Sequence, residues 1–202
     1  MSKVHMLKIT AHMDKDILPF LDEVAELRIK IFREWPYLYD GDIKTENNYL
    51  KAFADTKDSL LVLAKEYEKI VGVVMGLPVA ESMKQIQEEY QRQNVSTDGI
   101  FYLADAIILA PYRGQGIGTR MLQIFENLVV EMQKYDQISF CEIVRDQNHP
   151  LKPKDYQSLD AFWEQLDFYP IPGWQTSFDY LDIGNSEETP HLMRFRRKII
   201  LQ

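Results

Sequence analysis

The chain has 202 residues, 46% of them hydrophobic and 27% charged, a composition typical of a globular protein with a sizeable core. The formal net charge of −8 argues against a nucleic-acid partner, because phosphate binding favours a basic face. Cys141 is the only cysteine, which excludes an internal disulfide framework and a cysteine-based zinc site. We expect a single domain over residues 1–202. We also expect a cytoplasmic protein with no membrane partner, because Met1–Thr10 lacks a signal-peptide core.

In chain order, the first half of the sequence predicts a strand, two helices and a hairpin. Apolar side chains recur at helical spacing in the first helix, which Trp35-Pro36 ends. Two β-rich runs separated by residues 66–69 predict the hairpin. The expected elements are a strand at Lys8–His12, helices at Ile17–Glu34 and Thr45–Asp55, and strands at Leu60–Lys65 and Ile70–Leu77.

The second half alternates helices and strands. A polar segment between Pro78 and Asp98 favours a helix, on which Met83, Ile86 and Tyr90 are spaced to form one apolar stripe. The next strand is apolar on both faces, as expected of a central strand. The expected elements are a strand at Phe101–Leu109, a helix at Gly118–Met132, a strand at Gln137–Val144, a helix at Ser158–Leu166, and strands at Thr176–Leu181 and Leu192–Ile200. This order indicates an α/β sheet of mixed direction, with an extra helix between the third and fourth strands.

The most informative stretch is residues 113–118, Arg-Gly-Gln-Gly-Ile-Gly, which joins the central strand to the next helix. Three glycines at alternate positions remove side chains that would keep a ligand from the backbone. The free N–H groups of a helix's first turn form an anion site that suits a pyrophosphate. A dinucleotide fingerprint fails because Met121 replaces its third glycine, and Gly118-Thr119-Arg120 does not end a Walker A loop. The alternative is a glycine turn without a ligand.

The pattern that fits is R-x-x-G-x-G, which Arg113, Gly116 and Gly118 fill after Pro111-Tyr112. It resembles the coenzyme A loop of the GNAT superfamily of N-acetyltransferases. Nearly the whole chain is similar to a group of bacterial GNAT proteins, and the segments that carry this similarity are Trp35–Gly41, His149–Leu151, Asp155-Tyr156, Leu159–Trp163 and Glu187–Pro190. The resemblance implies the GNAT fold, with a mixed, mostly antiparallel central sheet flanked by helices. It also implies direct transfer of an acetyl group from acetyl-CoA to a primary amine in a ternary complex, without a metal.

For the cofactor, the resemblance implies a site made of backbone groups. The N–H groups from Gly114 to Thr119 would bind the pyrophosphate, and the side chains of Arg113 and Arg120 would add positive charge. The pantetheine arm would insert like an added strand where the fourth strand separates from the fifth. The expected cofactor residues are Ile107, Ile108, Leu109, Arg113, Gly114, Gln115, Gly116, Ile117, Gly118, Thr119 and Trp163.

For catalysis, Asp105 is our candidate base, because burial in an apolar strand would raise its pKa. A structural carboxylate paired with an arginine or a helix end is an equal alternative. Many GNAT enzymes protonate the leaving thiolate with a tyrosine, whose place Trp163 takes here. Since an indole is no acid at neutral pH, we expect Trp163 to pack beside the cofactor. Tyr156 is our candidate acid, with Tyr169 or solvent as alternatives, and Glu142 and His149 are weaker candidates for the base.

The acceptor pocket is expected between the first helix pair and the inserted helix, with Arg33, Tyr37 and Tyr39 as substrate-binding residues. A tyrosine-rich packed turn is the alternative for these three. The partner is a small-molecule amine or a protein amine. A non-catalytic acyl-CoA-sensing module, a transferase for longer acyl groups and a dinucleotide oxidoreductase are the rival functions. The last two strands form either a homodimer edge or the finished end of the sheet.

Overall fold

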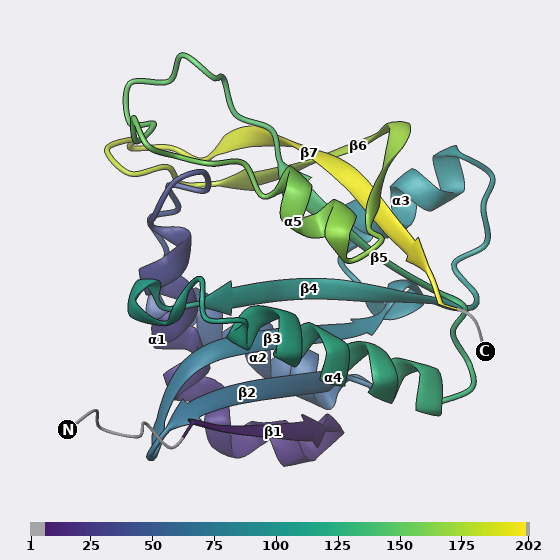
Figure 1. Ribbon diagram of the computed structural model, residues 1–202. Coiled ribbons are helices and arrows are strands. Elements are labelled where there is room, and N and C mark those ends of the chain that lie inside the picture. Colours follow the sequence, from purple (N-terminus) through teal and green to yellow (C-terminus); the bar gives the residue numbers. More distant parts are fainter. Residues whose placement is uncertain (1–6, 201–202) are drawn as a thin grey trace.

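The computed structural model describes residues 7–200. Residues 1–6, most of the segment inspected for a signal peptide, and residues 201–202 lie outside the described residues. The centre of the molecule is a seven-stranded sheet with the strand order β1-β2-β3-β4-β5-β7-β6 (Figure 1). The strands are β1 (Leu7–Met13), β2 (Leu60–Glu66), β3 (Lys69–Pro78), β4 (Ile100–Ile108), β5 (Gln137–Ile143), β6 (Tyr169–Tyr180) and β7 (Thr189–Ile199). Only the β4–β5 pair is parallel among these neighbours.

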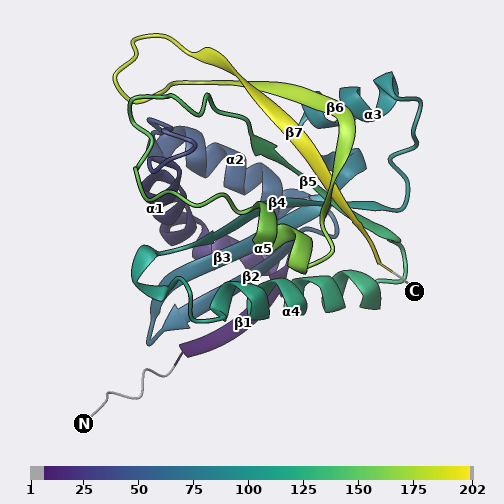
Figure 2. The same cartoon turned by 45° about the horizontal axis from the view of Figure 1, so that its top comes forward.

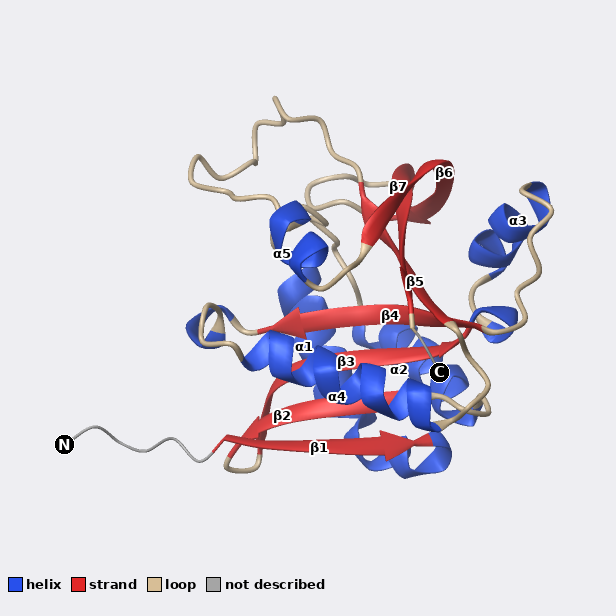
Figure 3. Cartoon of the chain, turned by 45° about the vertical axis from the view of Figure 1, so that its right-hand side comes forward, coloured by secondary structure: helices blue, strands red, loops and turns tan. Residues whose placement is uncertain are grey.

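Helices cover both faces of this sheet (Figure 2). They are α1 (Leu21–Phe32), α2 (Ile43–Asp55), α3 (Lys84–Arg92), α4 (Ile117–Glu131) and α5 (Asp160–Gln165). Helices α1 and α2 lie together on one face, and α4 crosses the other face (Figure 3). The predicted order of elements, the mixed sheet and the inserted helix between the third and fourth strands are confirmed.

Two predicted boundaries are wrong by four residues or more, and a proline lies at each. The first helix begins at Leu21, because a 3-10 segment, Asp14–Phe20, contains Pro19 and precedes it. Strand β6 begins at Tyr169 and not at Thr176. The register against β7 shifts between Pro170 and Gln175, so residues 171–174, which include Pro172, bulge out of the ladder without ending the strand.

Helix α3 packs against the C-terminal strands. The Tyr90 hydroxyl lies 2.6 Å from the Ser139 hydroxyl of β5, and the Tyr90 ring makes an edge contact with Trp174 of β6. Ile86 and Tyr90 are fully buried, whereas Met83 is 44% exposed because it precedes the helix. The inserted helix therefore fixes the C-terminal strands on the face that α1 and α2 also cover.

Candidate active site

The central strands β4 and β5 pair only at their beginnings. The parallel ladder runs from Ile100 opposite Gln137 to Tyr102 opposite Ser139, and no further pair follows among the described residues. The β3–β4 register also shifts between Met75 and Gly76, which marks a bulge in the same region. A gap between β4 and β5 therefore opens toward the end of β4, as the resemblance implied.

The backbone of β4 has free groups along this gap. The Leu109 N–H donates to Val71 O at 2.9 Å, so Leu109 is bonded to β3. Because successive residues of a strand point their N–H groups to opposite sides, the N–H groups of Ala106 and Ile108 face the gap. Ala106 is exposed although it lies inside a central strand. Of the three strand residues expected to hold the pantetheine arm, Ile108 is the one with its backbone on the gap.

The glycine turn 113–118 leads from β4 into α4. Gly114 (φ 71°) and Gly116 (φ 75°) adopt left-handed conformations that favour glycine. A Cβ at Gly114, Gly116 or Gly118 would meet no atom within 4 Å, so the space above the turn is open. Within residues 7–200 no side chain caps the start of α4, and the Arg120 N–H is the group that reaches back to Gly116 O, at 3.1 Å. The N–H groups of the preceding first turn therefore remain available to an anion.

Arg113 is held close to this turn. Its Nε donates to Ile108 O at 3.0 Å, and its Nη2 lies 2.8 Å from Glu34 Oε2. The side chain thus links the end of β4 to the end of α1. Its charge is shared with Glu34, so Arg113 positions the turn as well as contributing charge to it.

Asp105 lies on the face of β4 that α1 and α2 cover. Its carboxylate accepts a hydrogen bond from Arg28 Nη1 of α1, and the Nε of the same guanidinium lies 2.5 Å from Glu46 Oε2 of α2. Burial raises the pKa of Asp105. The Arg28 guanidinium acts in the opposite direction, and the negative charge of Glu46 raises the pKa of Asp105 further. The sequence did not mark Arg28 or Glu46, because polar residues on amphipathic helices usually face solvent.

Tyrosine side chains surround this cluster. Burial raises the pKa of Tyr37, Tyr49 and Tyr102, so all three phenols are neutral at pH 7. The Tyr102 hydroxyl lies 2.9 Å from Cys141 Sγ of β5, and burial raises the pKa of that thiol to about 12. Cys141 is therefore a protonated, buried side chain and not a nucleophile.

The segment between α1 and α2 holds the three residues predicted to bind substrate. Arg33 forms an exposed ion pair with Asp40. The Tyr37 ring packs on Phe32 with ring centroids 4.8 Å apart. The Tyr39 side chain hydrogen-bonds Glu46, which joins it to the Asp105 cluster. Tyr37 and Tyr39 thus come together near Asp105, and Arg33 lies outside this group.

Arg145, just after β5, anchors the same segment. Its Nε donates to Pro36 O at 2.9 Å and its Nη2 to Tyr37 O at 2.5 Å. Its Nη1 also lies 2.8 Å from Asp182 Oδ2, beyond β6. One side chain therefore joins three segments that are far apart in the sequence at the wide end of the gap.

Trp163 and Tyr156 lie in the part of the chain that follows β5. The Trp163 ring is 6% exposed and packs on Phe140 of β5, with centroids 4.4 Å apart, as a packing role requires. Tyr156 is half-buried, with its ring centroid 6.0 Å from that of Trp35. Burial raises the pKa of Tyr156, and Glu142 and Asp160 add to that effect, so its hydroxyl carries a proton at neutral pH.

Glu142 is a side chain of an ion-pair network and not a free base. Arg194 Nε lies 2.7 Å from Glu142 Oε1, and Arg196 Nε lies 2.5 Å from the same oxygen. Both arginines also bind Asp160 at the start of α5. His149, the other weaker candidate, packs against Trp35 with ring centroids 5.3 Å apart.

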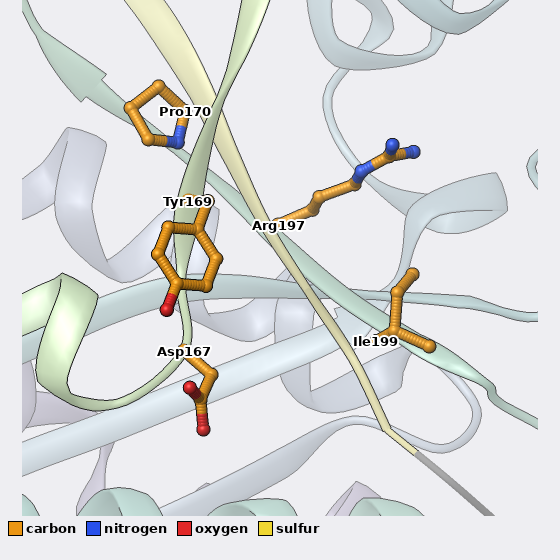
Figure 4. Close-up of a pocket in the computed structure, with 5 residues that line it drawn as sticks. All are labelled: Asp167, Tyr169, Pro170, Arg197 and Ile199. Atoms are coloured by element: carbon orange, nitrogen blue, oxygen red, sulfur yellow. The ribbon is translucent and has the colours of Figure 1, made fainter.

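The surface of residues 7–200 includes two hollows with different linings. One of about 190 Å³ lies between α2 and the segment before α3, where the acceptor pocket was expected, and it is lined by Tyr49, Ala52, Phe53, Thr56, Leu77, Glu81, Ser82, Met83 and Tyr102. The other, of about 410 Å³, lies along β6 and β7, and Figure 4 shows its lining residues, Asp167, Tyr169, Pro170, Arg197 and Ile199. Arg197 and Ile199 in this lining belong to the C-terminal end of β7, and Figure 1 shows that end of β7 on the other side of the molecule from the start of α4.

Residues 7–200 contain no group of three or more His, Cys, Asp or Glu side chains placed to hold a metal ion. Nor does any helix in that range have the length and apolar character needed to cross a membrane.

Comparison with solved structures shows the same fold in acetyltransferases. An aminoglycoside 6'-acetyltransferase type Ii is 17% identical with a TM-score of 0.58. An aminoglycoside 6'-N-acetyltransferase complexed with coenzyme A is 15% identical with a TM-score of 0.60, and Arabidopsis thaliana NAA60 in complex with a bisubstrate analogue is 13% identical with a TM-score of 0.60. Each alignment covers 96% of this chain and 98% of the other. No curated protein matches the sequence.

The family comparison is more specific than the likeness in fold. Residues 21–153 match the Acetyltransferase (GNAT) family, and that range includes α1, α2, the β4–β5 gap and the glycine turn. The chain therefore belongs to the GNAT family of acetyltransferases and is an N-acetyltransferase with acetyl-CoA as its co-substrate.

Proposed function

We propose that this enzyme transfers the acetyl group of acetyl-CoA directly to a primary amine within a ternary complex. The observation that carries the proposal is the position of Asp105. It lies one residue before Ala106, whose N–H faces the gap, and its own side chain lies on the α1–α2 face. A base and an amide donor thus flank the place where β4 and β5 separate.

The donor would occupy the gap and the glycine turn. The pyrophosphate would bind the free N–H groups between Gly114 and Thr119 at the start of α4. The pantetheine arm would hydrogen-bond Ile108 as an added strand, because the backbone of Leu109 is already bonded to β3. The thioester oxygen would then face the Ala106 N–H, which stabilises the negative charge that develops there.

The acceptor would approach from the other face. The hollow between α2 and the start of α3 has Tyr49 and Tyr102 in its wall, and the Tyr49 ring also packs on the Arg28 guanidinium of the Asp105 cluster. Glu81, on its rim, favours a positively charged ammonium group over an anion. A small-molecule amine or a protein amine both satisfy this chemistry, and Tyr37 and Tyr39 would line the approach.

The proton transfers can be assigned in order. Asp105 takes one proton from the bound ammonium, which leaves a neutral amine. The amine nitrogen attacks the thioester carbon, a C–N bond forms, and the C–S bond breaks as the coenzyme A thiolate leaves. The thiolate takes a proton from Tyr156, and the surplus proton of the new amide nitrogen returns to Tyr156. Asp105 releases its proton to solvent before the next turnover. The products are the acetylated amine and coenzyme A.

A thiol-release assay with acetyl-CoA and a panel of primary amines tests this function. We expect turnover by the wild type, and a loss of 100-fold or more in Asp105→Asn, in line with about 10²–10⁴-fold for general base catalysis. Asp55→Asn is the matched control, because it removes an exposed carboxylate from α2 without touching the cluster. Binding of acetyl-CoA without turnover of any amine would instead support the acyl-CoA-sensing module.

Three further properties stay predictions. They are a single domain over residues 1–202, a cytoplasmic location, and the role of the last strands, which form either a homodimer edge or the finished end of the sheet. Phe195 of β7 is fully buried and so belongs to the core, whereas Ile199 is 57% exposed and remains a candidate for such a contact.

A further inference from the structure

Arg28 is shared by two buried carboxylates that come from different elements. Glu46 of α2 occupies its Nε, and Asp105 of β4 occupies its Nη1. The three side chains are only 4% to 11% exposed. Neither carboxylate therefore has the guanidinium to itself.

Aromatic rings fix the orientation of this guanidinium. Its central carbon lies 5.0 Å from the centroid of the Phe32 ring and 4.7 Å from that of the Tyr49 ring. Such contacts hold an arginine by its flat faces and leave its edges for hydrogen bonds. Arg28 therefore cannot turn its whole charge toward Asp105 without losing these contacts and its bond to Glu46.

The cluster has an unbalanced charge. Two carboxylates and one guanidinium leave one surplus negative charge in a buried place, and such a charge is costly unless a cation or a proton joins it. Burial lowers the pKa of Arg28, but Asp105, Tyr49 and Glu46 raise it above its ordinary value, so the guanidinium stays charged. The proton that neutralises the surplus therefore goes to a carboxylate.

The other titratable groups around Asp105 are neutral at pH 7. Tyr37 from the segment after α1 and Tyr49 from α2 interact with Asp105, and Tyr102 from β4 and Cys141 from β5 interact with those two phenols. Burial raises the pKa of each. Met75, the β3 residue opposite Asp105, is apolar. Arg28 and Glu46 are thus the charged groups with which Asp105 interacts in the cluster.

We propose that Glu46 is a positioning residue, which engages part of Arg28 and so leaves Asp105 free to accept the proton of the acceptor ammonium. This inference rests on the proposed function, in which Asp105 is the base. With Arg28 to itself, Asp105 would remain an ion-paired carboxylate, a poor base. Once Asp105 takes the proton, Arg28 and Glu46 remain as a balanced ion pair, so the transfer removes the surplus charge.

The test is a ¹³C NMR titration of the Asp105 carboxyl group in the full-length protein, with the signal assigned by its absence in Asp105→Asn. In the wild type we expect a midpoint above the ordinary value of about 3.9. In Glu46→Gln, which keeps the volume and one acceptor oxygen but removes the charge, we expect the midpoint about one pH unit lower. Glu46→Asp keeps the charge and should restore the wild-type midpoint, and Asp55→Asn should not change it.

The same variants are then compared by the pH dependence of kcat/KM. The acid limb should move downward in Glu46→Gln by the amount that the NMR midpoint moves. An unchanged or higher midpoint in Glu46→Gln would overturn the role of Glu46. A wild-type midpoint at or below the ordinary value would overturn it without any variant. A lower midpoint with an unmoved acid limb would instead show that Asp105 is not the base, so the proposed function would fail while the coupling between the three residues stands.

Discussion

Gly118 allows the stability of the fold to be separated from coenzyme A binding. It is the second residue of α4, and a Cβ there would meet no atom within 4 Å. In Gly118→Asp the new carboxylate lies in the first turn, where it interacts favourably with the helix dipole by about 0.3–1 kcal/mol. We therefore expect the free energy of unfolding without ligand to stay unchanged or to rise.

The same carboxylate should abolish binding of the pyrophosphate. Two like charges about 4 Å apart repel by about 4 kcal/mol at an effective dielectric constant of about 20, which corresponds to more than 100-fold in affinity. Acetyl-CoA at about 100 times the wild-type Kd should stabilise the wild type by about 2.7 kcal/mol. A 100-fold weaker site would gain only about 0.4 kcal/mol under the same conditions.

Thermal and urea unfolding with and without acetyl-CoA measure both quantities. Gly118→Ala is the control, because it adds a methyl group to the same open space without charge and should keep most of the ligand's effect. If Gly118→Asp folds and still gains the full 2.7 kcal/mol or so, the pyrophosphate does not bind at the start of α4. Loss of folding in Gly118→Asp would show that the turn depends on this glycine for a reason other than the ligand.

Three more predictions concern other parts of the site. In urea titrations, the free energy of unfolding of Asp105→Asn minus that of the wild type should increase from pH 4 to pH 8. The reason is that the wild-type carboxyl has a raised pKa in the folded state, so it loses its stabilising contribution as the pH rises through that pKa. Trp163→Ala should lower the free energy of unfolding by about 3–5 kcal/mol, since it removes a buried ring packed on Phe140. Arg145→Lys should raise the KM for the amine but not for acetyl-CoA in two-substrate kinetics, because one ammonium group cannot replace the bonds that three guanidinium nitrogens make to Pro36 O, Tyr37 O and both Asp182 oxygens.

Features that depend on neighbouring residues could be predicted from the sequence. The hairpin of β2 and β3, helix α4 and the glycine turn all follow from local periodicity or from glycine spacing, and the structure confirms them. The start of β6 could not be predicted, because Pro170 and Gly173 are typical of a loop. Only the ladder with β7 shows that the strand continues on both sides of the bulge.

Contacts between distant residues could not be predicted in the same way. Asp105 is conspicuous as an acid inside an apolar strand, but its partner Arg28 lies 77 residues earlier. Glu46 lies 18 residues after Arg28, on another helix. The spacing of Glu46 indicated burial, since it lies at i, i+3, i+4 and i+7 with Tyr49, Leu50 and Phe53 on the apolar face of α2. Its partners did not follow from that spacing, because only the packing of α1 and α2 on one face of the sheet brings the three side chains together.

Asp105 pairs with an arginine, as a purely structural carboxylate would. This pairing is also compatible with the role of Asp105 as the catalytic base. A single Arg–Asp pair would be balanced, and a proton would gain little by joining it. Glu46 changes that balance, because its carboxylate gives the buried group one negative charge too many. When an ammonium group binds, it would supply the missing positive charge. After the transfer, the proton on Asp105 would neutralise the same surplus negative charge. The cluster can therefore stabilise the fold between turnovers and accept a proton during each one.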